Sequence, residues 1–204
     1  MREVRPGVWH WEGPHPDWDE SEPWDEQVSS YAIDDGERVL LVDPIAPPPE
    51  IDELAAGRET LIVLTNAWHE RDARSLVGRL GAPVWVPPPD EGSPDVAWLL
   101  ADGEGEGHLY RPGDELPPGV DDVFAGREPN DLILWIASMR VVILGDTIVD
   151  FGEGLEIPPV WLHEGVTRDQ MAETLRPLLD LPVEHVLPTH GAPTGRDALV
   201  RALS

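Results

Sequence analysis

The sequence predicts an α/β fold (α+β in some classification schemes) of four layers, an αββα sandwich in which two mixed sheets pack face to face. Two observations lead to this prediction. An apolar strand ending in aspartate, a helix, a strand ending in threonine and a second helix follow one another twice along the chain. Extra antiparallel strands precede each copy, and two such sheets bury both faces when they pack together and carry helices outside. The 204 residues suffice for one substantial core, so we expect a single domain, residues 1–204.

The first half of the chain carries the first copy of this order. Residues 4–11 predict a strand with a turn at Pro6-Gly7, and residues 12–27 form an irregular loop rich in Trp, Pro and acidic residues. Long ordered loops in compact domains are often lids or binding loops. Asp35-Gly36 is a hairpin signal because both residues tolerate positive φ. Apolar runs and helical spacing predict the other elements: strands 28–33, 38–43 and 61–65, and helices 50–56 and 73–80.

The second half is less regular before it repeats the order. Thr167 and Gln170 form a capping-box signature that opens a helix, and Pro177 predicts that this helix kinks or ends early. Residues 150–165 are expected to be loop. Short apolar runs between turn residues predict the strands 84–86, 108–111, 122–124, 132–137, 140–144 and 185–188, and a helix 196–203 closes the chain.

Polar residues follow the strands at matching places in the two copies. Asp43 and Asp146 end the first strand of each copy, and Thr65-Asn66 and Thr189-His190 end the second. The carboxyl ends of parallel strands open into a shared crevice, which is where open sheets place their chemistry. We therefore expect the functional site at this edge.

Composition excludes several classes of function. The chain has 14 basic residues, all of them Arg, and 40 acidic residues, which gives a net charge of −26. Because such a surface repels phosphate groups and anionic lipids, we expect no binding to nucleic acid or to membrane surfaces. The acidity fits a salt-rich cytoplasm or an acidic surface encoded by an Arg-favouring genome. Without Cys there is no thiolate chemistry, and without Lys there is no ordinary P-loop. We see neither a secretory signal nor an apolar run long enough for a membrane span, and expect a cytoplasmic protein.

Five short motifs follow one another along the chain, at residues 40–43, 64–71, 124–127, 143–146 and 189–191. In their order and spacing they resemble the motifs of the metallo-β-lactamase-fold superfamily, over nearly the whole chain. Within that superfamily, the chain looks closest to uncharacterised bacterial members with a His-Pro-Asp-Trp segment and a Trp-His-x-Arg turn, here residues 15–18 and 68–71.

The resemblance implies a metal centre, but most ligand positions differ. Active members carry His-x-His-x-Asp-His, a middle His, a Gly-Asp and a final His, and these bind one or two divalent ions, usually zinc, whose bound water attacks an ester, amide, thioester or phosphodiester. The ligand places of the first turn fall on Asn66, Trp68, Glu70 and Arg71, and the middle His place falls on Arg127. Only Asp146 and His190 match. This is a degenerate set, because neither Trp nor Arg offers a lone pair to a metal.

We therefore expect a metal-poor or metal-free site, with no cofactor. Our hypothesis is that Arg71 and Arg127 pair with clustered carboxylates and replace the charge of the metal. The alternative is one zinc or other divalent ion held by Glu70, Asp146 and His190.

Other residues are candidates for binding a substrate. Trp68 and His69 adjoin the lost ligand places. His69 either hydrogen-bonds to the backbone beside Trp68, or enters the site if the turn shifts by one residue. His15 and Trp18, in the Trp-rich loop, form either a lid over the crevice or a plug at the edge of the sandwich.

Two functions stay open. In the first, the chain has an eroded metal centre and is catalytically silent or acts as a binding module. In the second, it is a mononuclear-metal or metal-free hydrolase of a small ester, thioester or phosphodiester. His190 would then be the base, oriented by Asp146, with Arg71 and Arg127 stabilising an oxyanion or a small anionic substrate. Nothing in the sequence indicates the oligomeric state.

Overall fold

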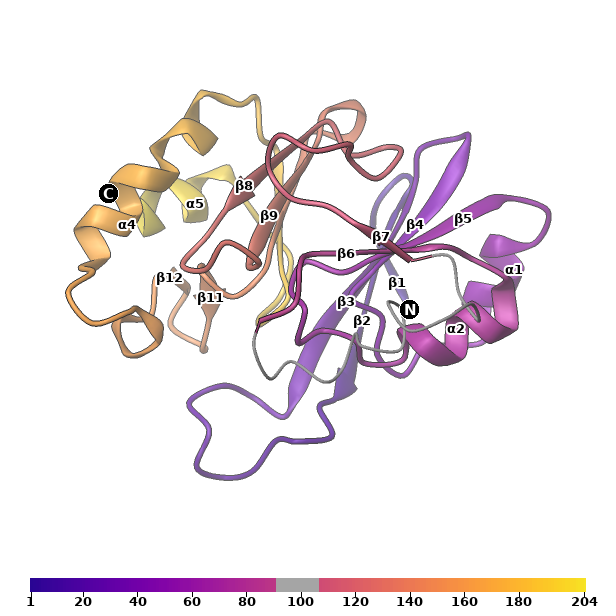
Figure 1. Cartoon of the computed structure of the whole chain (residues 1–204), viewed down its shortest axis with the longest axis horizontal. Helices are drawn as coiled ribbons and strands as arrows, with labels where there is room; N and C mark the ends of the chain where they lie inside the picture. Colours follow the sequence, from indigo (N-terminus) through magenta and orange to yellow (C-terminus); the bar gives the residue numbers. More distant parts are fainter. Residues whose placement is uncertain (91–106) are drawn as a thin grey trace.

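Two β-sheets packed face to face form the centre of the molecule in the computed structural model, which describes residues 1–90 and 107–204. Helices α1 and α2 cover the outer side of one sheet, and α4 and α5 cover the outer side of the other (Figure 1). The predicted αββα sandwich is confirmed.

The larger sheet has seven strands in the order β1-β2-β3-β4-β5-β6-β7. Its first four strands are antiparallel neighbours, and β4 to β7 run parallel to one another. The β1–β2 hairpin turns at Pro6-Gly7, as predicted. The strands are Arg2–Arg5 (β1), Val8–Pro14 (β2), Gln27–Asp34 (β3), Arg38–Val42 (β4), Glu59–Val63 (β5), Val84–Val86 (β6) and Gly107–Leu109 (β7).

The smaller sheet has five strands in the order β14-β13-β10-β9-β8. Only β10 and β13 run parallel in it. Residues 150–165, expected to be loop, include part of a separate two-stranded hairpin, β11 with β12. The bounds are Asp122–Ala125 (β8), Leu132–Ile136 (β9), Val141–Leu144 (β10), Val149–Asp150 (β11), Leu155–Glu156 (β12), His185–Pro188 (β13) and Thr194–Gly195 (β14).

The helices begin and end close to where the sequence predicts. The capping box of α4 is present: the Thr167 side chain accepts from the Gln170 backbone and the Gln170 side chain accepts from the Thr167 backbone. Pro177 lies in a 3-10 turn directly after α4, so the helix ends early. The helices are Glu50–Ala55 (α1), Ala73–Leu80 (α2), Arg168–Leu175 (α4) and Arg196–Ala202 (α5), with 3-10 turns at Ala137–Met139 (η1), Pro159–Trp161 (η2) and Arg176–Asp180 (η3).

Alternation along the strands divides the apolar side chains among three cores. In β4, Leu40 and Val42 face the smaller sheet, whereas Val39 and Leu41 lie under α1 and α2. The third core lies between the smaller sheet and α4 and α5. Each fully buried aliphatic side chain of this kind contributes about 1.5–3 kcal/mol, so the sandwich is a rigid support for the loops at its edges.

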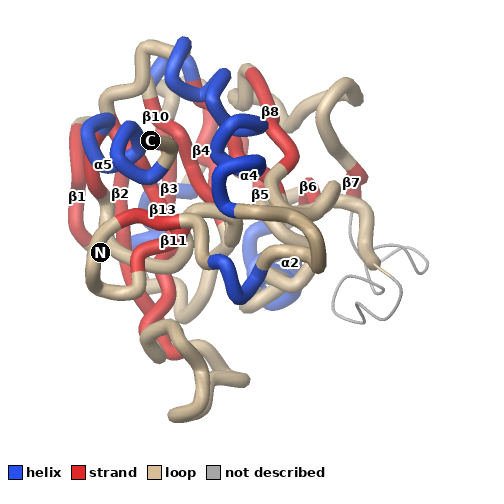
Figure 2. The backbone as a smooth tube through the Cα atoms, turned by 90° about the vertical axis from the view of Figure 1, so that its left-hand side faces the viewer, coloured by secondary structure: helices blue, strands red, loops and turns tan. Residues whose placement is uncertain are grey.

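The parallel pairs β4–β5 and β10–β13 bring the polar strand ends together. The Leu132 N–H donates to the Thr65 carbonyl across the two sheets (2.8 Å), and Asn66 forms a bridge with Asp131. The end of the larger sheet that carries Thr65 therefore meets the end of the smaller sheet that carries Asp146. The loop of residues 15–26 connects β2 to β3 and projects from the body of the molecule in the ribbon and tube views (Figures 1 and 2).

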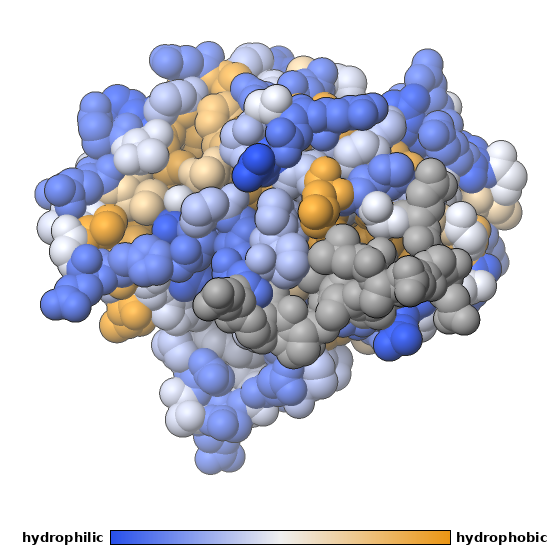
Figure 3. All heavy atoms as spheres, viewed as in Figure 1, coloured by the Kyte–Doolittle hydropathy of each residue, from blue (hydrophilic) through white to orange (hydrophobic). Residues whose placement is uncertain are grey.

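Hydrophilic residues occupy most of the face drawn in Figure 3. In the part of the chain that the structure describes, no helix combines the length and the apolar character that crossing a membrane requires.

Candidate functional site

Three buried side chains converge where the two sheets meet. His69 Nε2 lies 3.3 Å from Asp146 Oδ1, and His190 Nε2 lies 3.6 Å from the same oxygen. One donor atom from each of the three residues lies within 4.8 Å of the others, and all three residues are buried. Among the described residues, this is the one group of His and carboxylate side chains close enough to share a metal ion.

His69 is held in place by the end of β4. Its Nδ1 lies 3.1 Å from Asp43 Oδ2 and 3.2 Å from Thr65 Oγ1. Asp43 is fully buried and also accepts the backbone N–H and the hydroxyl of Thr65 (2.8 and 2.5 Å). Nδ1 thus faces one carboxylate and Nε2 faces another, that of Asp146. A carboxylate at Nδ1 is the partner that orients a histidine whose Nε2 binds a metal ion in many metal sites.

Asp146 is positioned from its side chain and from its backbone. Its Oδ2 accepts the Asn66 amide (3.0 Å), and its N–H donates to Asp131 Oδ1 (3.0 Å). The other carboxylate oxygen, Oδ1, is buried and faces Nε2 of both His69 (3.3 Å) and His190 (3.6 Å) without a close hydrogen bond to either. These distances exceed those of a good hydrogen bond, so this buried oxygen is only loosely satisfied by its neighbours.

Charges within the cluster shift its pKa values in opposite directions. Burial opposes a charge on His69, but the carboxylates of Asp146 and Asp43 outweigh burial and raise the pKa of His69 to about 9. Burial lowers the pKa of His190 to about 3, against the opposing effect of Asp146. Burial alone would raise the pKa of Asp146, yet His69 and then His190 reverse this and hold it well below its usual range.

The two arginines take different partners. Arg127 Nε lies 3.4 Å from Asp131 Oδ2, and Nη2 lies 3.6 Å from Asp146 Oδ2. Arg71 donates from Nη1 to the main-chain carbonyls of Ser29 (2.9 Å) and Asp43 (2.8 Å). Its backbone is left-handed, with a φ of 46°, which is rare and costly for a residue other than glycine and typical of functional sites.

Tryptophans line the pocket in front of the cluster. The pocket has a volume of about 340 Å³, and the Trp24 and Trp161 rings meet the His190 ring edge-on, with centroids 4.9 and 5.8 Å away. Trp68 stands at this pocket with 49% of its surface exposed, which is unusual for so large an apolar side chain. The residues lining the pocket are His15, Asp17, Trp24, Trp68, His69, Arg127, Asp146, Trp161 and His190.

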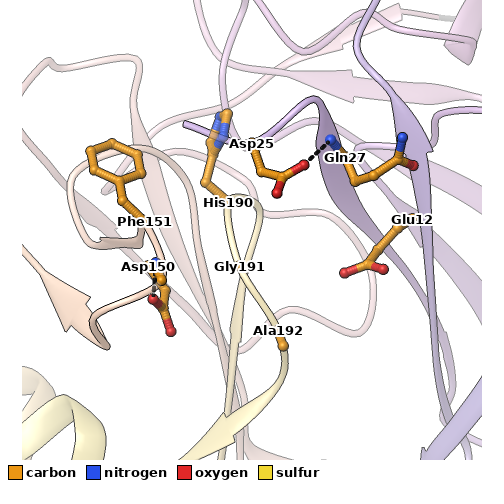
Figure 4. A pocket seen from close by; sticks show the side chains of 9 residues that line it. Glu12, Asp25, Gln27, Asp150, Phe151, His190, Gly191 and Ala192 are labelled. Carbon is orange, nitrogen blue, oxygen red and sulfur yellow. Dashed lines mark hydrogen bonds between the residues drawn. The ribbon is translucent and has the colours of Figure 1, made fainter. Parts of the chain in front are cut away.

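A second pocket, of about 370 Å³, also borders His190 (Figure 4). The carboxylates of Glu12, Asp25 and Asp150 line it, together with Phe151. Asp25 accepts the Gln27 N–H (2.9 Å), and Asp150 accepts the Gly152 N–H (2.7 Å), so at least two of these carboxylates cap their own loops.

Comparison with known proteins identifies the fold. No protein-family model matches the sequence, and no curated protein sequence matches it. The structure, however, is similar to the solved structure of DIM-1 metallo-β-lactamase, with a TM-score of 0.68 and 14% sequence identity over 98% of this chain and 93% of that one. It is also similar to a metallo-β-lactamase from Erythrobacter litoralis, with a TM-score of 0.66 and 15% identity over 99% and 93% of the two chains.

The chain has the metallo-β-lactamase fold. A third solved structure, TMB-1, matches with a TM-score of 0.66 and 16% identity over 99% of this chain and 94% of that one. At this level of identity the likeness establishes the fold, and the chemistry has to be argued from the side chains present.

Within the metallo-β-lactamase fold, the structure brings together most of the residues that the sequence nominated. His69, Asp146, His190, Arg127, Trp68 and His15 all line one pocket. The group of possible ligands contains His69 where the sequence analysis placed Glu70. Trp18 does not line the pocket; its Nε1 donates to the Trp24 carbonyl (2.7 Å) and so supports the neighbouring Trp that does.

Sequence reasoning missed three residues of the site. Trp24 and Trp161 come from loops, and no periodicity in the sequence marks them as neighbours of His190. Asp131 is fully buried directly before β9 and contacts both Asp146 and Arg127. An acidic residue adjoining an apolar strand was the available signal, since a carboxylate at that position must find partners.

The donor set fits one metal ion of the kind that the metallo-β-lactamase fold implies. Two imidazoles and a carboxylate are typical zinc ligands, and two ligand atoms each about 2.0–2.1 Å from a tetrahedral ion are about 3.3–3.4 Å apart. The separations of 3.3 and 3.6 Å from Asp146 Oδ1 are close to this value, and the ligand atoms of the two histidines lie within 4.8 Å of each other. A second ion does not fit as well, because Arg127 lies on the other side of the Asp146 carboxylate.

Proposed function

We propose that this protein is a hydrolase of the metallo-β-lactamase fold that uses one metal ion, held by His69, Asp146 and His190, to cleave a small ester, thioester or phosphodiester. The convergence of three buried ligand atoms, in which both imidazole nitrogens face one Asp146 carboxylate oxygen, carries the proposal. The likeness to metallo-β-lactamases supports it at the level of the fold.

Charge balance supports the same proposal. Asp43, Asp131 and Asp146 are buried, and the permanent cations acting on them are Arg71 and Arg127. One carboxylate is thus left without a permanent counter-charge, and an uncompensated buried charge costs several kcal/mol. Burial and the charge of Asp146 accordingly raise the pKa of Asp131 to about 7, so that a proton on Asp131 relieves part of this cost. A metal ion supplies the missing positive charge, as does a proton on His69.

Several residues in and behind the pocket have a role in this proposal. A zinc ion bound by such ligands lowers the pKa of a bound water molecule toward neutrality. Asp43 orients the His69 ring through Nδ1. Trp24 and Trp161 shield His190 from bulk water, and Arg127 puts positive charge on the pocket wall, where it favours an anionic group of a substrate.

Metal content tests the proposal. Protein purified without chelator from zinc-supplemented cells should contain about one equivalent of metal, and His69→Ala, Asp146→Ala and His190→Ala should each lose most of it. Glu70→Gln is the matched control and should retain it. Turnover of p-nitrophenyl acetate or bis(p-nitrophenyl) phosphate should disappear with a chelator and return with zinc. Metal-free wild-type protein, or a loss of metal in Glu70→Gln instead, would contradict the assignment.

A second candidate is a metal-free binding protein, which corresponds to the eroded centre expected from the sequence. The raised pKa of His69 favours it, because a protonated imidazole between Asp43 and Asp146 satisfies both carboxylates. In that case Arg127 and His69 together would attract a small anionic ligand. Metal content and turnover also distinguish the two candidates. A metal-free binding protein would be purified without metal and would hydrolyse neither p-nitrophenyl acetate nor bis(p-nitrophenyl) phosphate.

A further inference from the structure

Asp131 is a fully buried carboxylate that holds the turn presenting Asp146. Its Oδ1 accepts the Asp146 N–H (3.0 Å), and its Oδ2 accepts the Thr147 hydroxyl (2.5 Å). Thr147 Oγ1 in turn accepts the Arg127 N–H (2.6 Å). Asp131 is therefore connected to the Asp146 backbone directly and to the Arg127 backbone through one hydroxyl.

The Arg127 side chain lies between two carboxylates. Nε is 3.4 Å from Asp131 Oδ2, whereas Nη2 is 3.6 Å from Asp146 Oδ2. Trp161 also holds the Arg127 guanidinium, because Nη1 donates to the Trp161 carbonyl (3.2 Å) and the guanidinium carbon lies 5.0 Å from the centre of the Trp161 ring. Neither carboxylate makes the close two-point contact that a guanidinium prefers, and the contact of Nε with Asp131 is an ion pair without a hydrogen bond.

This position of Arg127 matters for Asp146. An arginine that closed on the Asp146 carboxylate would form a bidentate pair with it and would put a fixed positive charge beside the Oδ1 atom that faces His69 and His190. Such a pair would compete directly with a divalent ion. The Asp131 carboxylate, 3.4 Å from Arg127 Nε, offers a second anionic partner on the other side of the guanidinium.

We propose that Asp131 is a positioning residue that tethers Arg127 away from Asp146 and so keeps the Asp146 carboxylate open to a metal ion. This effect of Asp131 on the position of Arg127, called the tether below, is a property of the metal-free protein. Only the effect of the tether on metal affinity rests on the proposed function.

Crystal structures of metal-free wild-type protein and of Asp131→Asn test the tether itself. Asn keeps the size of Asp131 and can still accept the Asp146 N–H, but it removes the charge that faces Arg127. The expected result is that Arg127 Nη2 moves to hydrogen-bond distance of the Asp146 carboxylate, about 2.7–2.9 Å. A guanidinium that stays over Trp161 in the variant would overturn the proposal, whether or not the protein binds metal.

Zinc affinities of four proteins test the consequence. By titration against a competing chelator, Asp131→Asn should bind zinc about 10–100-fold more weakly than wild type, the usual effect of changing an outer partner of a metal ligand. Arg127→Ala should bind at least as tightly as wild type, and the double variant should match Arg127→Ala, because the arginine that Asp131 restrains is gone. Asp121→Asn, whose Oδ2 caps the Ala137 N–H at an exposed site (2.6 Å), is the control and should match wild type.

A purely structural role for Asp131 predicts a different outcome. The loss of zinc affinity would then persist unchanged in the double variant, and this would contradict the tether. Wild-type protein that binds no zinc would instead contradict the proposed function, while the two metal-free structures would still decide where Arg127 goes.

Discussion

His69 couples the protonation of the site to the stability of the whole chain. It lies between Asp43 and Asp146, with ring nitrogens 3.1 and 3.3 Å from their oxygens, and these charges raise its pKa from 6.5 to about 9 against the effect of burial. Because the folded-state pKa is the higher one, the stabilisation is complete below pH 6.5 and is lost as the pH rises through 9. The whole effect is about 3 kcal/mol.

Urea unfolding of metal-free protein measures this effect. In the presence of a chelator, the free energy of unfolding of wild type should fall between about pH 6 and about pH 10. His69→Gln cannot take up the proton and should lack this part of the fall. Equal pH dependence in the two proteins would show that His69 is not held charged between the carboxylates.

The same residue shows why the site could be predicted only in part. The sequence placed a cluster of titratable residues after the strand that ends near Leu64, and it left open which of them enters the site. The turn decides this: the His69 N–H donates to the Asn66 carbonyl (3.0 Å), and Arg71 adopts a left-handed backbone. His69, and not Glu70, is thereby turned toward Asp146. Neither feature leaves a signal in residue spacing.

At the scale of elements, Gly145 is the one residue between the end of β10 and Asp146, and the space around it has no room for a side chain. A Cβ on Gly145 would collide with Asp131 Oδ1 and would lie 3.0 Å from the Leu132 carbonyl oxygen. Gly145→Ala should therefore destabilise the protein by about 1–3 kcal/mol and weaken metal binding, because Asp131 and Asp146 must both shift.

Gly78 offers a matched comparison within α2. It is exposed, and a Cβ there would meet no atom within 4 Å. Gly78→Ala should stabilise the protein by up to about 1 kcal/mol through helix propensity and should leave metal content unchanged. The two variants are compared by urea unfolding. Similar stability changes in both would mean that the turn before Asp146 is not tightly packed.

Long periodic elements were predictable, and two-residue strands were not. The helix expected at 73–80 is observed as Ala73–Leu80, and the capping box at Thr167 opens α4 as predicted. By contrast, β11, β12 and β14 span two residues each, which is too short for any alternation to show. They form because neighbouring backbone groups need partners, which only the tertiary structure provides.

At the scale of the whole molecule, the repeated order of elements was enough to predict the sandwich. The strands that end in Asp43 and Asp146 each pair in parallel with the strand that leads to Thr65 or Thr189. Parallel pairing fixes the four polar ends at one edge, and the apolar faces of the two sheets fix how the edges meet. The position of Trp24 over His190 could not be predicted, since it depends on how the loop of residues 15–26 folds back.

The central claim is that one metal ion lies between His69, Asp146 and His190. A crystal structure of the zinc-soaked protein, with anomalous differences collected at the zinc absorption edge, tests it most directly. We expect one peak within about 2.0–2.2 Å of Nε2 of both histidines and of an Asp146 carboxylate oxygen. Two peaks, a single peak away from these atoms, or no peak with Asp146 closed on His69 or Arg127 would contradict the account.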